Sequence, residues 1–99
     1  MKRNPIIEDF CKKCKAIYNY YRVKILKEIR LPWKENGLSK DALLTFFKYT
    51  EASQRMMDKI AYNLIVEHPE ISEDINNVVE HFIRRFASLA VNIRRRISR

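Results

Sequence analysis

Apolar residues recur at helical spacing over the last quarter of the chain, from Ser72 to Arg99. The intervals between them alternate between four and three residues, which is the period of a helix that buries one stripe. The stripe consists of Ile75, Val79, Phe82, Phe86, Leu89, Ile93 and Ile97. Ser72 is a favourable N-cap, and the carboxylates of Glu73 and Asp74 complement the positive end of the helix dipole. The pattern predicts one long amphipathic helix.

The same period occurs near the N-terminus. Asn4 followed by Pro5 predicts an N-cap and a first helical residue. Pro32 disfavours helical geometry at the residue before it, so this helix is expected to end near Arg30. One side of the predicted helix is apolar and consists of Ile7, Phe10, Cys11, Cys14, Ile17, Tyr18, Tyr21, Ile25 and Ile29.

A third helical stretch follows a loop that contains the only glycine, with Ser39 as its predicted N-cap. It is expected to end at His68, which precedes Pro69. Its apolar stripe consists of Leu43, Phe46, Phe47, Thr50, Ser53, Met57, Ile60 and Leu64, widened by Ala61, Ile65 and Val66. Because helices of this length are uncommon, a break or a kink is expected in one of the three, around Thr50 to Ser53 of this helix.

These patterns predict an all-α fold, an elongated antiparallel bundle of about three long helices. Each helix would contain ~25 residues and be ~40 Å long at a rise of ~1.5 Å per residue. The chain shows no period-two strand pattern and no internal repeat. Its 99 residues are enough for one domain, residues 1–99, with a single core.

Basic residues exceed acidic ones and give a formal charge of +8. This charge favours acidic partners such as nucleic acid, anionic lipid or an acidic protein surface. The surplus falls on the two ends of the sequence, whereas residues 35–70 are mildly acidic. No apolar run approaches the ~18 to 20 residues that span a bilayer, and no secretory signal is evident. We therefore expect a soluble, intracellular protein.

Cys11 and Cys14 form a C-x-x-C match on the apolar side of the first predicted helix. A redox pair normally follows a strand and begins a helix, and a zinc site would need two further ligands. The only histidines are His68 and His81, on different elements and not at the spacing of a zinc finger. Buried structural cysteines are the favoured interpretation, with metal or redox chemistry as the alternative.

Neither histidine has a serine, cysteine or carboxylate neighbour at a catalytic spacing, and a single glycine excludes a Gly-rich phosphate loop. The paired carboxylates Glu8-Asp9 and Glu73-Asp74 are explained by helix first turns. We therefore expect no enzymatic activity, catalytic residue, bound metal, cofactor or small-molecule substrate.

The basic residues on the outer faces of two predicted helices are the candidate binding groups. Guanidinium groups bind phosphate bidentately, although cations at a helix C-terminus are also favoured by the dipole alone. Tyr20 is predicted to be exposed among the lysines, where a base could stack on it. The candidates are Lys12, Lys24, Lys27, Arg30, Arg84, Arg85, Arg94, Arg95, Arg96 and Arg99.

The leading functional hypothesis is binding of nucleic acid through its phosphate backbone, without sequence preference. The alternative is a protein-interaction or assembly subunit, such as a homo-oligomer, because apolar positions such as Val23, Tyr20 and Tyr49 are left over after the core is filled. Binding to a membrane surface ranks third and rests on the amphipathic, basic-flanked C-terminal helix.

The overall length, the segments Cys11 to Cys14 and Tyr18 to Tyr21, and the arginine-rich ending from Ile93 to Arg99 carry a family resemblance. The chain resembles the short, basic, isoleucine- and arginine-rich proteins of filamentous double-stranded DNA viruses of hyperthermophilic acidophilic archaea, the lipothrixvirus and rudivirus group. The resemblance implies a cytoplasmic or virion protein stable to heat and acid, and it assigns no functional residues. The high charge and twelve isoleucines also indicate thermostability.

Overall fold

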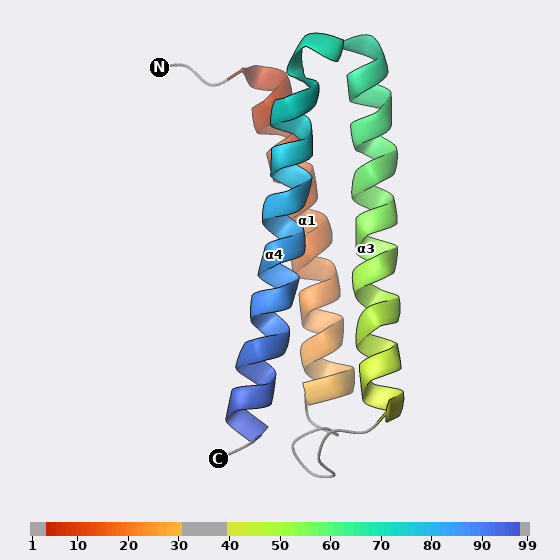
Figure 1. Ribbon diagram of the computed structural model, residues 1–99, viewed down its shortest axis with the longest axis vertical. Helices are drawn as coiled ribbons and strands as arrows, with labels where there is room; N and C mark the ends of the chain where they lie inside the picture. Colours follow the sequence, from red (N-terminus) through yellow and green to blue (C-terminus); the bar gives the residue numbers. More distant parts are fainter. Residues whose placement is uncertain (1–3, 31–39, 98–99) are drawn as a thin grey trace.

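The protein is a bundle of long helices in the computed structural model (Figure 1). The structure describes residues 4–30 and 40–97, and the side chains of residues 4–28 and 42–93. The elements are α1 (Pro5–Ile25), the π-helical segment η1 (Leu26–Arg30), α3 (Lys40–Glu67), the 3-10 turn η2 (Pro69–Ile71) and α4 (Ser72–Ile97). The predicted N-cap Ser39 lies outside the described residues.

The three long helices lie side by side and form an elongated body of 48 × 26 × 17 Å. α3 runs antiparallel to both α1 and α4, which are therefore parallel to each other (Figure 1). The predicted all-α, elongated antiparallel bundle is thus confirmed. No helix among the described residues has the length and apolar character required to cross a membrane.

The first helix begins where the sequence predicts it. The Oδ1 atom of Asn4 accepts a hydrogen bond from the backbone N–H of Ile6 at 2.9 Å, and Pro5 occupies the first helical position. α-helical geometry continues to Ile25, after which η1 completes the helix at Arg30. The predicted end is therefore right, but the last turn is a π-helix, a rare conformation that a periodicity argument does not anticipate.

α3 is continuous, so the predicted break around Thr50 to Ser53 is wrong. The Thr50 hydroxyl donates to the carbonyl oxygen of Phe47 at 3.0 Å, which satisfies it within the helix. Ser53 is fully buried against the neighbouring helices. Tertiary packing along the whole length of α3 stabilises a helix longer than average.

The connection between α3 and α4 is a single tight turn. The N–H of His68 still bonds to the Leu64 carbonyl at 2.7 Å, and Pro69 then begins η2. Ser72 has helical angles, φ −57° and ψ −41°, and is the first residue of α4. Its predicted role as N-cap is wrong, because an N-cap has non-helical angles and η2 leads directly into the helix.

One core runs along the bundle axis and contains the predicted apolar sides of α1 and α4 as far as they are described, since the side chains of Ile29 and Ile97 lie outside the described residues. The buried apolar side chains are Phe10, Cys14, Tyr18, Ile25, Phe46, Met57, Ala61, Ile71, Ile75, Val79, Phe82, Phe86 and Ile93. Two predicted core residues of α3 are wrong, since Phe47 is 59% and Val66 is 63% exposed. Both lie outside the stripe of about 100° that a bundle helix buries.

Candidate nucleic-acid interface

Contacts from α1 to α3 define one seam of the bundle. The Tyr21 hydroxyl donates to Met56 Sδ at 3.5 Å, and the Tyr49 hydroxyl donates to the Glu28 carboxylate. The bond to Glu28 is the main reason that the pKa of Tyr49 is raised above its usual value. We call this surface the α1/α3 seam.

Three tyrosines cross the seam. Tyr20 and Tyr21 lie 5.1 Å apart, nearly perpendicular, and Tyr21 lies 6.0 Å from Tyr49. Tyr21 and Tyr49 are half-buried, whereas Tyr20 is 57% exposed, as the sequence predicted. The ring of Tyr20 is therefore the accessible end of an aromatic row that joins two helices.

Lys24 lies over two of these rings. Its Nζ atom is 5.0 Å from the centre of the Tyr20 ring and 5.7 Å from that of Tyr49. An ammonium group is attracted to the negative face of an aromatic ring. Hydrogen bonding to Tyr20 and the charges of Tyr20, Tyr49 and Glu28 raise the pKa of Lys24, so the cation persists at neutral pH.

Further lysines border the seam on both helices. Lys27 is exposed and lies in η1, three residues after Lys24. On α3, spacings of four, four and three residues place Lys48, Ala52, Met56 and Lys59 on one side, and both lysines are exposed. Lys24 thus lies over the exposed Tyr20. Lys48 and Lys59 lie on the side of α3 whose Met56 accepts the Tyr21 hydroxyl.

The two arginines of α4 whose side chains are described, Arg84 and Arg85, do not lie on the α1/α3 seam. The guanidinium carbon of Arg85 is 4.5 Å from the Tyr18 ring centre and 5.8 Å from that of Phe82. These rings belong to the core, so Arg85 covers it along the seam between α1 and α4, called the α1/α4 seam below. Arg84 forms an ion pair of 2.7 Å with Glu80 one turn away.

Most of the remaining candidates whose backbone is described lie at one end of the bundle. The ends of α1 and α4 and the start of α3 lie together (Figure 1), so the backbones of Arg30, Lys40 and Arg94–Arg96 share that end with Lys27. The side chains of Arg30 and Arg94–Arg96 and all of Arg99 lie outside the described residues. Lys12 is exposed nearer the opposite end.

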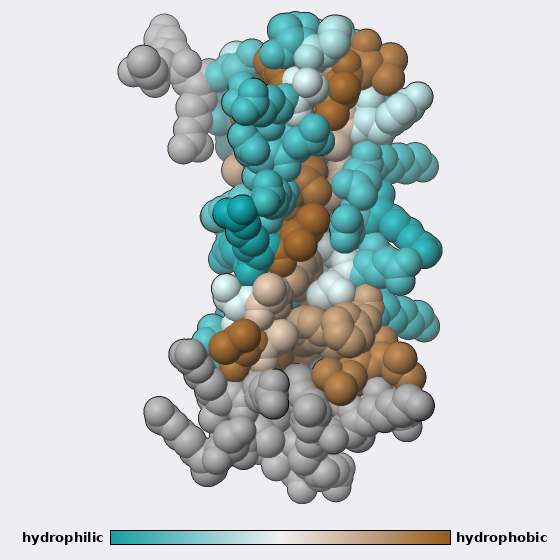
Figure 2. Space-filling model, in the orientation of Figure 1, coloured by the Kyte–Doolittle hydropathy of each residue, from teal (hydrophilic) through white to brown (hydrophobic). Residues whose placement is uncertain are grey.

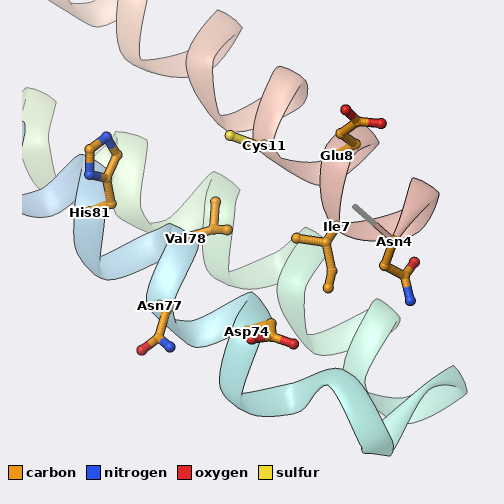
Figure 3. Close-up of a pocket in the computed structure, with 8 residues that line it drawn as sticks. All are labelled: Asn4, Ile7, Glu8, Cys11, Asp74, Asn77, Val78 and His81. Carbon is orange, nitrogen blue, oxygen red and sulfur yellow. The ribbon is translucent and has the colours of Figure 1, made fainter. Parts of the chain in front are cut away.

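That opposite end contains a cavity of about 620 Å³ on the α1/α4 seam (Figure 3). Its lining combines apolar side chains with carboxylates, and the Cys11 thiol points into it. The lining residues are Asn4, Ile7, Glu8, Cys11, Asp74, Asn77, Val78 and His81. Glu8 and Asp74 repel phosphate, so the cavity is not part of the candidate interface.

Cys14 lies in the core, in agreement with the structural interpretation of the cysteines. Its burial, and secondarily the proximity of Cys11, raises the pKa of Cys14 to about 12. The thiol therefore stays protonated at neutral pH and is a poor nucleophile. Among residues 4–30 and 40–97, no three His, Cys, Asp or Glu side chains are placed to hold a metal ion.

Sequence reasoning found Lys24, Lys27 and Tyr20 but missed the contribution of α3 to the same surface. Tyr49 was counted only among the apolar positions left over after the core is filled, and Lys48 and Lys59 were not among the candidate binding groups. The register of two antiparallel helices joined by a loop would have indicated this contribution of α3. Positions equally far from the connecting loop face each other in an antiparallel pair, which puts Tyr21 opposite Tyr49.

No protein-family model, curated protein or solved structure matches this chain. The resemblance to proteins of filamentous archaeal viruses therefore stays a prediction.

Proposed function

We propose that this protein is a non-enzymatic nucleic-acid-binding protein that contacts the phosphate backbone without sequence preference. The observation that carries the proposal is the α1/α3 seam, where Lys24 lies over the exposed ring of Tyr20 and the exposed Lys27 follows three residues later. Lysines that track a backbone next to an aromatic side chain are typical of surfaces that bind nucleic acid nonspecifically.

The distribution of charge supports this location. Acidic residues concentrate at the end of the bundle where α3 passes into α4, as with Glu67, Glu70, Glu73 and Asp74. Basic positions concentrate at the other end, toward which Lys24 and Lys27 also lie. A phosphate backbone is therefore attracted to the basic half of the molecule and repelled by the acidic end. Arg94–Arg96 and Arg99 would extend the contact beyond the seam.

Two carboxylates of α1 and α3 form ion pairs, whereas Glu28 keeps its charge beside the seam. Asp9 pairs with Lys13 at 3.1 Å, and Glu51 pairs with Arg55 at 2.6 Å. Glu28 accepts the Tyr49 hydroxyl. No ion pair engages Lys24, Lys27, Lys48 or Lys59 among the described residues, so these four cations remain for phosphate.

The test is a fluorescence-anisotropy titration of labelled oligonucleotides at several salt concentrations. Affinity should fall steeply with salt and vary little between sequences, since binding releases condensed counterions. Lys24→Ala should reduce the slope of log K against log salt by about 0.7 to 0.9, the value for one phosphate contact. The matched control is Arg55→Ala, which also removes one exposed cation but one already paired with Glu51.

Arg55→Ala should leave the slope unchanged. Absence of binding to both duplex and single strand at low salt would remove the proposal. An identical slope change in both variants would show that nucleic acid does not bind at the α1/α3 seam.

The second candidate is assembly into a homo-oligomer. Figure 2 shows hydrophobic surface along the seam between α3 and α4. Leu44 and Phe47 on α3 and Ile83 and Val91 on α4 are exposed apolar side chains, from 37% to 59% of their surface. A patch of this kind on a soluble domain commonly marks a protein contact.

Light scattering across micromolar concentrations tests this candidate. Phe47→Lys should shift an oligomer toward monomer, whereas the control Tyr62→Lys, at a residue that is 69% exposed on the same helix, should not. A strict monomer in the unmodified protein would exclude self-assembly and leave only association with a different chain.

A further inference from the structure

Tyr20 is an aromatic ring held at the surface without a part in the core. It is 57% exposed and is absent from the apolar side chains that pack against the core cluster. Tyr18, two residues earlier on the same helix, is 4% exposed and packs on Phe82 and Phe86. Filling the interior therefore does not account for the aromatic residue at position 20.

The ring is nonetheless supported from the side and from one face. Tyr21 meets it nearly perpendicularly at 5.1 Å, and the Lys24 ammonium lies 5.0 Å from its centre. Tyr21 is itself fixed by its hydrogen bond to Met56 and its contact with Tyr49. A supported ring loses less conformational entropy on binding than a free side chain does.

A planar, exposed ring with cations beside it suits one class of ligand in particular. Every nucleobase has a π-face that stacks on an aromatic ring, whatever the sequence. In a duplex, neighbouring base pairs cover these faces, so only an unpaired base is accessible to a tyrosine on a helix surface. Lys24 lies about one turn from Tyr20 along the chain and Lys27 about two turns, so both can contact phosphates of a strand whose base stacks on the ring.

We infer that Tyr20 is a stacking platform for an unpaired base and that the protein therefore prefers single-stranded over double-stranded nucleic acid. This inference rests on the proposed backbone binding. The lysines supply sequence-independent affinity, and Tyr20 selects strands whose bases are accessible.

The test compares three labelled ligands of equal length by fluorescence anisotropy: a single strand, the same strand with abasic sites in place of its bases, and a duplex. The abasic strand keeps the phosphate charge and removes every base that could stack. The unmodified protein should bind the intact strand more tightly than either other ligand.

Tyr20→Ala should weaken binding of the intact strand by about 5-fold to 100-fold, the range measured for the loss of one base–aromatic stack. It should leave the salt slope and the affinity for the abasic strand unchanged. Tyr20→Phe keeps the ring and should bind nearly as the unmodified protein does. The control is Tyr62→Ala, which removes a tyrosine that is 69% exposed on α3 and should have no effect.

Equal affinity for the intact and abasic strands, or unchanged binding of the intact strand by Tyr20→Ala, would overturn the stacking inference and leave backbone binding in place. Failure to bind any of the three ligands at low salt would overturn both. Circular dichroism of each variant confirms that a loss of affinity does not come from unfolding.

Discussion

The α1/α3 seam and the α1/α4 seam contain the same kind of contact with different surroundings. Arg85 lies on Tyr18 and Phe82, whose exposed fractions are 4% and 2%, so the guanidinium covers the core. Lys24 lies on Tyr20, which is 57% exposed. The burial of the ring, not the presence of the cation, thus distinguishes a structural contact from one that can take part in binding.

The two seams also differ in where their acidic residues lie and in how these affect the binding of phosphate. Glu8 and Asp74 line the cavity on the α1/α4 seam and make it unfavourable for phosphate. On the α1/α3 seam, the Glu28 carboxylate accepts the Tyr49 hydroxyl, and two lysines, Lys24 and Lys27, lie within four residues of it in the sequence. The number of basic residues on a helix therefore says less about binding than the groups that surround each of them.

The largest expected effect is the loss of stability when a buried core ring beneath the α1/α4 seam is removed. Phe82→Ala removes a buried ring that contacts Tyr18 and Arg85, and it should lower the free energy of unfolding by about 3 to 5 kcal/mol. Its neighbour Ile83 is 37% exposed, so Ile83→Ala should cost about 1 kcal/mol or less. Urea unfolding followed by circular dichroism measures both.

The matching variant on the other seam is Tyr20→Ala, which should change stability by about 0.5 kcal/mol or less. Comparable losses of stability in Phe82→Ala and Tyr20→Ala would contradict the distinction between a structural and a binding seam.

A smaller effect compares two adjacent arginines. Arg85→Ala removes a cation and an aliphatic stem from two core rings and should lower stability by about 1 kcal/mol. Arg84→Ala breaks only an exposed ion pair with Glu80 and should change stability by about 0.5 kcal/mol or less. Thermal unfolding of the two variants side by side measures both losses. A larger loss in Arg84→Ala would contradict the conclusion that Arg85 is the arginine that stabilises the core.

The smallest expected effect at neutral pH comes from the ionisation of Cys14. At that pH its thiol is protonated in both the folded and the unfolded states. The pKa of Cys14 is raised from 9.0 to about 12 by burial. Its contribution to stability is therefore complete below pH 9 and is lost as the pH rises from 9 toward 12, where the unfolded state ionises first. Urea unfolding at pH 7 and at pH 10.5 measures this loss.

The control variants separate Cys14 from other groups that titrate at high pH. Cys14→Ala should be less stable at pH 7 but should lose less stability between pH 7 and 10.5 than the unmodified protein. Cys11→Ala should retain the full alkaline loss. A thiol reagent should modify the half-buried Cys11 in the folded protein and reach Cys14 only after unfolding. Equal alkaline losses in the two variants would show that other groups cause the effect.

How far the sequence predicted the fold differs between helices. On α1 and α4 the positions that periodicity assigned to the core, such as Phe10, Tyr18 and Phe86, are buried. On α3, apolar residues such as Phe47 and Val66 also occupy outer positions. Periodicity recognises residue type but not the direction of neighbouring helices, so it assigned both to the core.

The candidate site was predicted in part for the same reason. The exposure of Tyr20 and Lys27 follows from their positions along the first helical stretch, and the sequence identified both together with the half-buried Lys24. The contacts of Lys24 with Tyr49 and of Arg85 with Tyr18 join different helices. Such contacts depend on the rotation and register of packed helices, which ridges and grooves of both partners determine together.

The sequence by itself determined the local features of this protein. The cap at Asn4, the end of α3 before Pro69 and the apolar stripes of α1 and α4 all follow from interactions within a few turns of helix. Only the tertiary structure decided that Arg85 covers the core while Lys24 stays beside an exposed tyrosine. The physical reason is distance along the chain, because a residue acquires these surroundings only when helices far apart in sequence pack together.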